Sequence, residues 1–298
     1  MIEPTANVLI GTAFYVGILW VAQRNPRAAG MMLTFPTLNG LGLLMAAPSA
    51  SEETASAMLL MPLINAAMWS FYLAGFDRLV ARKMPPAVAS ALLIGAGATG
   101  WLVLASAVAR WQWGVPAAWQ GAYVFAVLGA GAVLTRALQP TEPRPRPASP
   151  AKPQALVTLL GRCRDRIAVF ALTLAALAAM NGWGASPALL GAMAGAPLVA
   201  MFGMQTIAGD EAATLKARQA SFAMMAEGLW LGPGIASAFI AALWRALAEL
   251  SVAVSGMTYQ LCAIVVLLAG WGLCLSAIWS LSRLMQRVLP KIPAERIP

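Results

Sequence analysis

The sequence predicts an all-α, polytopic integral membrane protein, and three observations carry this prediction. Of its 298 residues, 60% are hydrophobic and only 10% are charged, whereas about a quarter of the residues in an average soluble domain are charged. The mean hydropathy is +0.73. Apolar runs of about 20 residues recur along the chain, and each can cross a hydrocarbon core about 30 Å thick as a helix. This composition excludes a soluble two-domain protein.

Nine apolar runs are long enough to span a bilayer. Helices are expected because a segment in lipid must form hydrogen bonds among its own backbone N–H and C=O groups, and the runs lack the alternating pattern of barrel strands. The predicted spans are Ala6–Ala22, Ala28–Ala47, Ala55–Phe76, Pro86–Ala109, Ala117–Leu134, Ile167–Trp183, Pro187–Ala208, Ala220–Leu243 and Met257–Leu281.

The distribution of Lys and Arg predicts the orientation of these spans. With the amino terminus outside, all but two of the 20 basic residues fall on the inside, and the exceptions are Arg110 and Arg245. Cytoplasmic loops carry such an excess of positive charge. We therefore expect an amino terminus outside the membrane and a carboxyl terminus on the cytoplasmic side. The basic residues behind the net charge of +9 then fix the orientation in the membrane and attract anionic lipid headgroups. No nucleic-acid partner is expected.

A proline- and arginine-rich segment divides the chain. Residues 1–138 hold the first five spans, 139–166 form the segment, and 167–298 hold the last four spans and a short basic tail. Frequent proline favours extended polyproline II over helix. The segment is interpreted as a cytosolic linker, with a docking site for a cytosolic partner as the alternative.

A Gly-x5-Pro pattern occurs early in the second and seventh spans, as Gly30 with Pro36 and as Gly191 with Pro197. An acidic pair follows in each half, and the next span carries tryptophan. We interpret this order as an internal duplication: residues 6–109 form one four-helix unit, 117–134 a spacer helix, and spans six to nine the second unit. A single spacer inverts the second copy in the membrane.

Inverted repeats are common in secondary transporters, whose solute site lies near the midplane beside broken helices. Proline in a span removes a backbone hydrogen bond, so the sequence offers candidate breaks, with plain kinks as the alternative. These break candidates are Gly30, Pro36, Gly191, Pro197 and Pro233.

Glu227 is the one acidic residue well inside a predicted span, about 10 Å from its cytosolic start. A carboxylate at that depth is costly unless it faces a cavity or a partner, and such groups are functional candidates. We expect Glu227 to couple a proton or cation, with Asn39, Asn65 and Gln205 lining the same space. The alternative is a structural carboxyl that joins helices.

Several chemistries are excluded or unsupported. The chain has no His, which removes His-ligated metals and a Ser-His-Asp triad. Its three cysteines form no CxxC pair, and we expect no catalytic residues, metal or cofactor. Gly95-x-Gly97-x-x-Gly100 matches a dinucleotide fingerprint in letters only, because it lies mid-span. The Gly228-x3-Gly232 spacing predicts a face for close helix contact.

The segment Ala28–Thr37, which follows a basic turn, and Met68-Trp69-Ser70 on the third span resemble the GlpM family of small bacterial inner-membrane proteins. The resemblance covers about the first 110 residues, and the second half shares only Gly191 and Pro197 with the motif. It implies a roughly four-span membrane unit linked to envelope polysaccharide physiology, and it supplies no catalytic residues. It also implies a bacterial inner membrane, so the amino terminus is expected in the periplasm and the carboxyl terminus in the cytoplasm.

Two classes of function follow. The first is a secondary transporter or exporter of a small polar or anionic solute, with proton coupling through Glu227. The second is a non-catalytic inner-membrane subunit or scaffold that supports envelope polysaccharide synthesis. A second copy of the chain and a membrane complex both remain open as protein partners.

Overall fold

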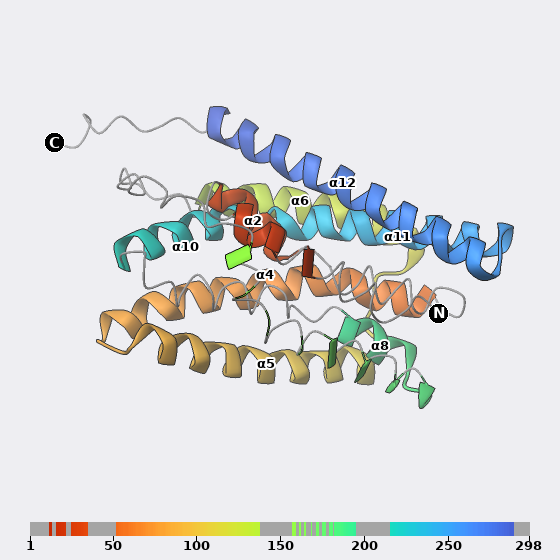
Figure 1. The fold of residues 1–298 in the computed structure, drawn as a ribbon, viewed down its shortest axis with the longest axis horizontal. Coiled ribbons are helices and arrows are strands. Elements are labelled where there is room, and N and C mark those ends of the chain that lie inside the picture. The colour runs from red at the N-terminus through yellow and green to blue at the C-terminus, as the bar shows by residue number, and fades with distance from the viewer. Residues whose placement is uncertain are drawn as a thin grey trace.

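The computed structural model describes residues 12–13, 16–21, 25–34, 52–137, 182–194 and 215–288, with isolated positions between 157 and 180. Every element in this part of the chain is helical (Figure 1), which confirms the all-α prediction there. The elements are α2 (Pro26–Leu33), α4 (Glu52–Ala81), α5 (Pro86–Trp111), the short 3-10 helix η1 (Ala117–Trp119), α6 (Gln120–Ala137), α8 (Pro187–Ala194), α10 (Leu215–Leu229), α11 (Gly232–Ala253) and α12 (Gly256–Val288).

Five helices in the described part are long and apolar enough to cross a membrane, so the chain is a helical membrane protein. They lie side by side along the long axis of the molecule (Figure 1). Short turns join α4 to α5 and α11 to α12, which makes these neighbours antiparallel. The five stretches are Ala55–Ala81, Pro86–Trp111, Ala117–Ala137, Gly232–Ala253 and Gly256–Met285.

The eighth predicted span, Ala220–Leu243, is wrong as a single helix. The chain breaks between Leu229 and Gly232, and the spanning helix α11 continues to Ala253. Pro233 lies in the first turn of α11, where its missing N–H costs nothing. Arg245 therefore lies on a helix and not in the outer loop that the sequence predicted.

The second and seventh predicted spans begin with short helices. For Ala28–Ala47 the described helix is α2, which ends at Leu33 with Thr34 as its C-cap. For Pro187–Ala208 it is α8. The remainder of both spans, and most of the first and sixth spans, lies outside the described residues.

The two short helices pack against opposite halves of the chain. Helix α2 contacts α10 and α12, whereas α8 contacts α4 and α5. Figure 1 shows them toward opposite ends of the bundle, α2 beside α10 and α8 beside the start of α4. Helices α4 and α11 pack on each other between them. The ring of Phe76 on α4 meets that of Phe222 on α10 edge to face, with centroids 5.0 Å apart.

Most of the described cationic side chains gather at one end of the bundle. This end holds the turn between α4 and α5 and the carboxyl ends of α6 and α12, at the left of Figure 1. Arg110 and Arg245 lie toward the other end. The cationic residues at the first end, on these helices and this turn, are Arg78, Arg82, Lys83, Arg136, Arg283 and Arg287.

Candidate functional site

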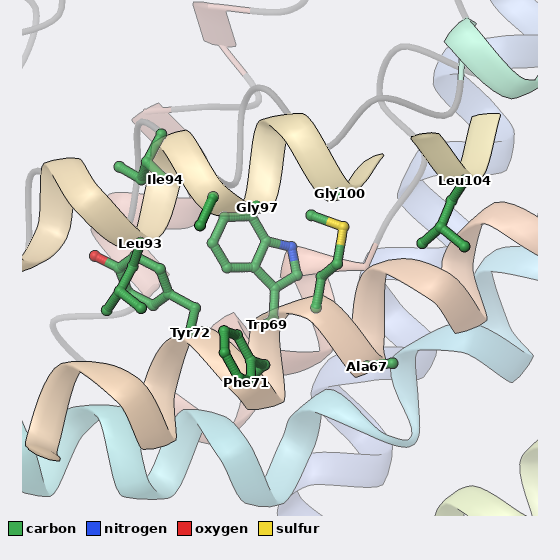
Figure 2. A pocket seen from close by; sticks show the side chains of 11 residues that line it. Ala67, Trp69, Phe71, Tyr72, Leu93, Ile94, Gly97, Gly100 and Leu104 are labelled. Atoms are coloured by element: carbon green, nitrogen blue, oxygen red, sulfur yellow. The ribbon is translucent and has the colours of Figure 1, made fainter. Parts of the chain in front are cut away.

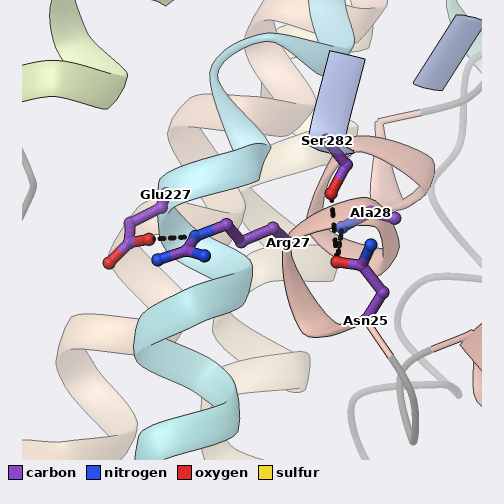
Figure 3. Close-up of polar contacts among 5 residues, drawn as sticks. All are labelled: Asn25, Arg27, Ala28, Glu227 and Ser282. Atoms are coloured by element: carbon purple, nitrogen blue, oxygen red, sulfur yellow. Dashed lines mark hydrogen bonds and ion pairs between the residues drawn. The ribbon is translucent and has the colours of Figure 1, made fainter. Parts of the chain in front are cut away.

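The buried carboxylate of Glu227 forms an ion pair with Arg27, whose side chain is partly exposed. The Arg27 Nε atom donates to Glu227 Oε2 at 2.6 Å, and the two side chains are 28% and 2% exposed respectively. Arg27 lies in the first turn of α2 and Glu227 in the last turn of α10. Figure 3 shows the guanidinium reaching across from α2 to the carboxylate. The bridge joins residues from the two halves of the chain.

Glycines let α2 and α10 approach closely enough for this pair to form. A Cβ atom on Gly228 would collide with the backbone carbonyl of Arg27, and one on Gly30 would collide with the carbonyl of Met225. A Cβ atom on Gly232 would collide with the Thr34 hydroxyl and with the backbone carbonyl of Met31. The Gly228-x3-Gly232 face that the sequence predicted therefore makes close helix contact.

A hydrogen-bonded N-cap fixes the start of α2. The Asn25 Oδ1 atom accepts from the Ala28 backbone N–H at 3.1 Å and from the Ser282 hydroxyl of α12, also at 3.1 Å (Figure 3). Asn25 is 6% exposed and Ser282 is fully buried. An asparagine N-cap satisfies a backbone donor that the helix itself cannot. The cap thereby holds Arg27, two residues later, in register with Glu227.

A second polar contact joins three spanning helices. The hydroxyls of Tyr123 on α6 and Ser237 on α11 both donate to the backbone carbonyl of Leu59 on α4, at 3.0 and 3.2 Å. Pro62 lies inside α4 one turn later, where proline disturbs the regular hydrogen bonding of a helix. Side-chain hydroxyls can satisfy backbone groups near such a proline in a membrane helix.

The other predicted site residues are only partly described. Asn65 is 4% exposed on α4, whereas Asn39 and Gln205 lie outside the described residues. Of the break candidates, Gly30 lies within α2 and Gly191 within α8, both inside continuous helix. Pro36 and Pro197 lie outside the described residues, and Pro233 follows the break before α11.

The sequence analysis missed Arg27 as the partner of Glu227, because it counted Arg27 only as a topological anchor. A signal was available. Arg27 immediately precedes the second predicted span and Glu227 lies about 10 Å inside the eighth, so both were expected near the same membrane surface. A long, flexible arginine side chain can reach a carboxylate part of the way into the membrane.

The described residues hold no group of three His, Cys, Asp or Glu side chains that could bind a metal ion. Cys262 and Cys274, both on α12, are free thiols. A described cavity of about 340 Å³ lies between α4 and α5 and has mostly apolar walls; Arg27 and Glu227 do not line it.

Comparisons with family models, curated proteins and solved structures found no match to this chain. The resemblance to the GlpM family accordingly rests on the short segments Ala28–Thr37 and Met68–Ser70 alone.

Proposed function

We propose that this protein is a secondary transporter of a small anionic solute, and that the Arg27 and Glu227 pair couples solute to protons. The observation that carries the proposal is the ion pair itself, formed at 2.6 Å around a carboxylate that is 2% exposed. A buried pair of this kind is weak evidence for stability alone, because its desolvation cost often equals its Coulombic gain. Glu227 lies near the end of α10, just before the spanning stretch Gly232–Ala253 and not inside it as the sequence predicted, and ionisable groups at membrane segments commonly mark ion and solute pathways.

The ion pair allows one anion to replace another on Arg27. A solute carboxylate or phosphate can replace Glu227 as the partner of Arg27, since guanidinium binds either group through paired hydrogen bonds. Glu227, left buried without its cation, then takes up a proton. Solute binding and protonation each weaken the same contact between α2 and α10, so each promotes the other.

Local repetition supports an inverted repeat. Asn25, Pro26, Gly30, Met32 and Pro36 are each separated by the same distance along the chain from Ser186, Pro187, Gly191, Met193 and Pro197. Helices α2 and α8 have matching bounds on this spacing.

The N-caps of α2 and α8 also match. Just as Asn25 accepts from Ala28, the Ser186 hydroxyl accepts from the Leu189 N–H at 3.3 Å. The packing is reciprocal too, because α2 contacts α10 and α12 while α8 contacts α4 and α5. This exchange of short helices between halves is what two units related by a twofold axis in the membrane plane would produce.

The ion pair breaks this symmetry. On the same spacing, Arg27 corresponds to Ala188 and Glu227 to Ala66, and both alanines are buried. A charged contact therefore holds one side of the molecule, and small apolar residues occupy the equivalent positions on the other. In the proposed transporter the ion pair closes the cytosolic side until solute and proton release it.

Purified protein in liposomes tests this proposal. An internal pH-sensitive dye reports proton entry when inorganic phosphate, succinate or gluconate is added outside at lower pH. We expect at least one of these anions to drive protein-dependent proton entry. Glu227→Gln should abolish the proton entry while the protein remains folded, and the matched variant Glu249→Gln, at an exposed position of α11, should behave as wild type.

Two outcomes contradict the proposal. The coupling role fails if Glu227→Gln transports with unchanged pH dependence. A Glu227→Gln protein that unfolds, while Glu249→Gln does not, indicates a structural carboxyl instead.

A second candidate function is a non-catalytic membrane subunit or scaffold for envelope polysaccharide synthesis. The close glycine contacts around Arg27 favour it, because they describe a solid joint between α2 and α10. In that case the double variant Arg27→Leu with Glu227→Gln should support polysaccharide output in cells at the wild-type level, whereas the transporter proposal requires a loss.

A further inference from the structure

A pocket lies between α4 and α5, away from the ion pair. Its cavity volume is about 340 Å³, and its walls include Trp69, Phe71 and Tyr72 of α4 and Leu93, Gly97 and Gly100 of α5. Figure 2 shows the side chains of Trp69 and Tyr72 extending from α4 toward α5. Phe71 is 69% exposed, so the pocket opens onto the outer surface of the bundle, which lipid covers in a membrane.

The wall contains a buried hydrogen-bond donor, the indole Nε1 of Trp69. Trp69 is 2% exposed, and its indole Nε1 makes no hydrogen bond within the part of the chain that the structure describes. Figure 2 shows its indole beside Gly97, with the nitrogen edge toward Gly100. Buried Trp N–H groups usually find a partner, and leaving a donor unsatisfied costs about 1 to 3 kcal/mol.

Glycines on α5 create the space beside this donor. A Cβ atom on Gly100 would meet no heavy atom within 4 Å, and one on Gly97 would lie 3.6 Å from the methyl carbon of Met68. Two of the three glycines in the mid-span Gly95-x-Gly97-x-x-Gly100 pattern therefore line the pocket.

The depth of the pocket restricts its occupant. Trp69 lies about 20 Å along the helix from either end of Ala55–Ala81, close to the bilayer midplane. Phospholipid ester carbonyls lie at the edges of a core about 30 Å thick, so they do not reach this depth. An acyl chain would fill the space but offers no acceptor, and a charged solute would be too costly there.

We propose that the pocket binds an uncharged, lipid-soluble molecule whose ring carries a carbonyl acceptor, the chemistry of a membrane quinone. The ring stacks among the aromatic side chains, and its carbonyl accepts from Trp69 Nε1. Because Nε1 is fully covered, one wall must move to admit the carbonyl. Met68 lines the same pocket, and its unbranched thioether side chain rotates readily.

Decyl-benzoquinone, which quenches nearby tryptophan fluorescence, tests the site with the full chain in lipid nanodiscs. We expect saturable quenching above the collisional background. Gly100→Leu should abolish the saturable component by filling the pocket. Gly95→Leu provides the matched control, because Gly95 also meets open space but does not line this pocket, and it should bind as wild type.

Two competitors test the hydrogen bond. 4-Decylcyclohexanone carries an acceptor and decylcyclohexane does not, so the ketone should displace the quinone about fivefold more effectively. Trp69→Phe, which keeps an aromatic ring without the N–H, should bind tritiated decyl-benzoquinone about fivefold more weakly while the protein remains folded. Equal potency of the two competitors would mean that the pocket holds an apolar chain only. Absence of saturable quenching, or its loss in Gly95→Leu, would overturn the site.

Discussion

Gly228 on α10 lies directly against the backbone carbonyl of Arg27 on α2. The residue before it, Glu227, binds the side chain of the same arginine. One crossing point therefore combines a close backbone approach with an ion pair. This combination explains why a short helix can hold a charged contact between the two halves, since the glycine removes the side chain that would keep the helices apart.

Gly228→Ala should accordingly destabilise the protein. The added methyl group would collide with a backbone carbonyl, which cannot move without shifting α2, and such overpacking typically costs about 1 to 3 kcal/mol. We expect a lower thermal unfolding temperature in detergent. Gly129→Ala on α6 is the control, because a Cβ atom there meets open space. Equal effects of the two substitutions would show that α2 and α10 do not cross at Gly228.

The two members of the ion pair should respond unequally to substitution. Glu227 is 2% exposed and Arg27 28%, so removing the arginine takes the cation away from a buried carboxylate, whereas removing the carboxylate leaves a cation that solvent reaches. Breaking a fully buried pair costs about 3 to 5 kcal/mol, and the partial exposure of Arg27 makes the expected cost smaller here. We expect Arg27→Leu to lower the unfolding temperature more than Glu227→Gln.

The double variant Arg27→Leu with Glu227→Gln completes this comparison. It should be more stable than Arg27→Leu alone, because Glu227→Gln removes the charge that needs the missing arginine. Additive losses in the double variant would show that the two side chains do not interact in the folded protein.

The N-cap of α2 should tolerate serine and not alanine. Asn25 accepts from the Ala28 N–H and from Ser282, and loss of an N-cap side chain costs about 0.5 to 2 kcal/mol. Asn25→Ala should therefore lower the unfolding temperature. Asn25→Ser should recover part of the loss, since Ser186 caps α8 in the equivalent way. A serine variant as unstable as the alanine variant would argue against equivalent caps.

Hydropathy alone was sufficient to predict four of the five long helices in the described part of the chain, because a lipid-spanning segment must be apolar and helical along its whole length. Predicted spans such as Pro86–Ala109 match the observed helices within a few residues. The eighth span failed for a local reason. Its apolar run continues through Gly232 and Pro233 without any change in hydropathy, and only the backbone chemistry of proline marks the start of a new helix.

The candidate site was half predictable. Glu227 stood out because one acidic residue in an apolar run is unusual. Arg27 did not, because a basic residue at the end of a span is the ordinary topological signal. Their pairing depends on a tertiary contact between segments 200 residues apart, and no periodicity within either segment contains that information.

The last prediction concerns orientation. In the described part of the chain, Arg78, Arg82 and Lys83 lie with other cations at one end of the bundle, whereas Arg110 lies toward the opposite end beside exposed tryptophans. Positive charge is retained on the cytoplasmic side, and tryptophan is favoured at either interface and so does not decide the direction.

Single cysteines in a variant lacking Cys163, Cys262 and Cys274 measure this orientation. Arg82→Cys and Trp113→Cys occupy exposed positions in turns at the two ends. In sealed inside-out membrane vesicles, where the cytoplasmic face is outermost, a membrane-impermeant maleimide should label Arg82→Cys and not Trp113→Cys. In right-side-out spheroplasts the pattern should reverse. Labelling of Trp113→Cys in the inverted preparation would place the basic end outside, and the ion pair between Arg27 and Glu227 would then close the periplasmic and not the cytosolic side.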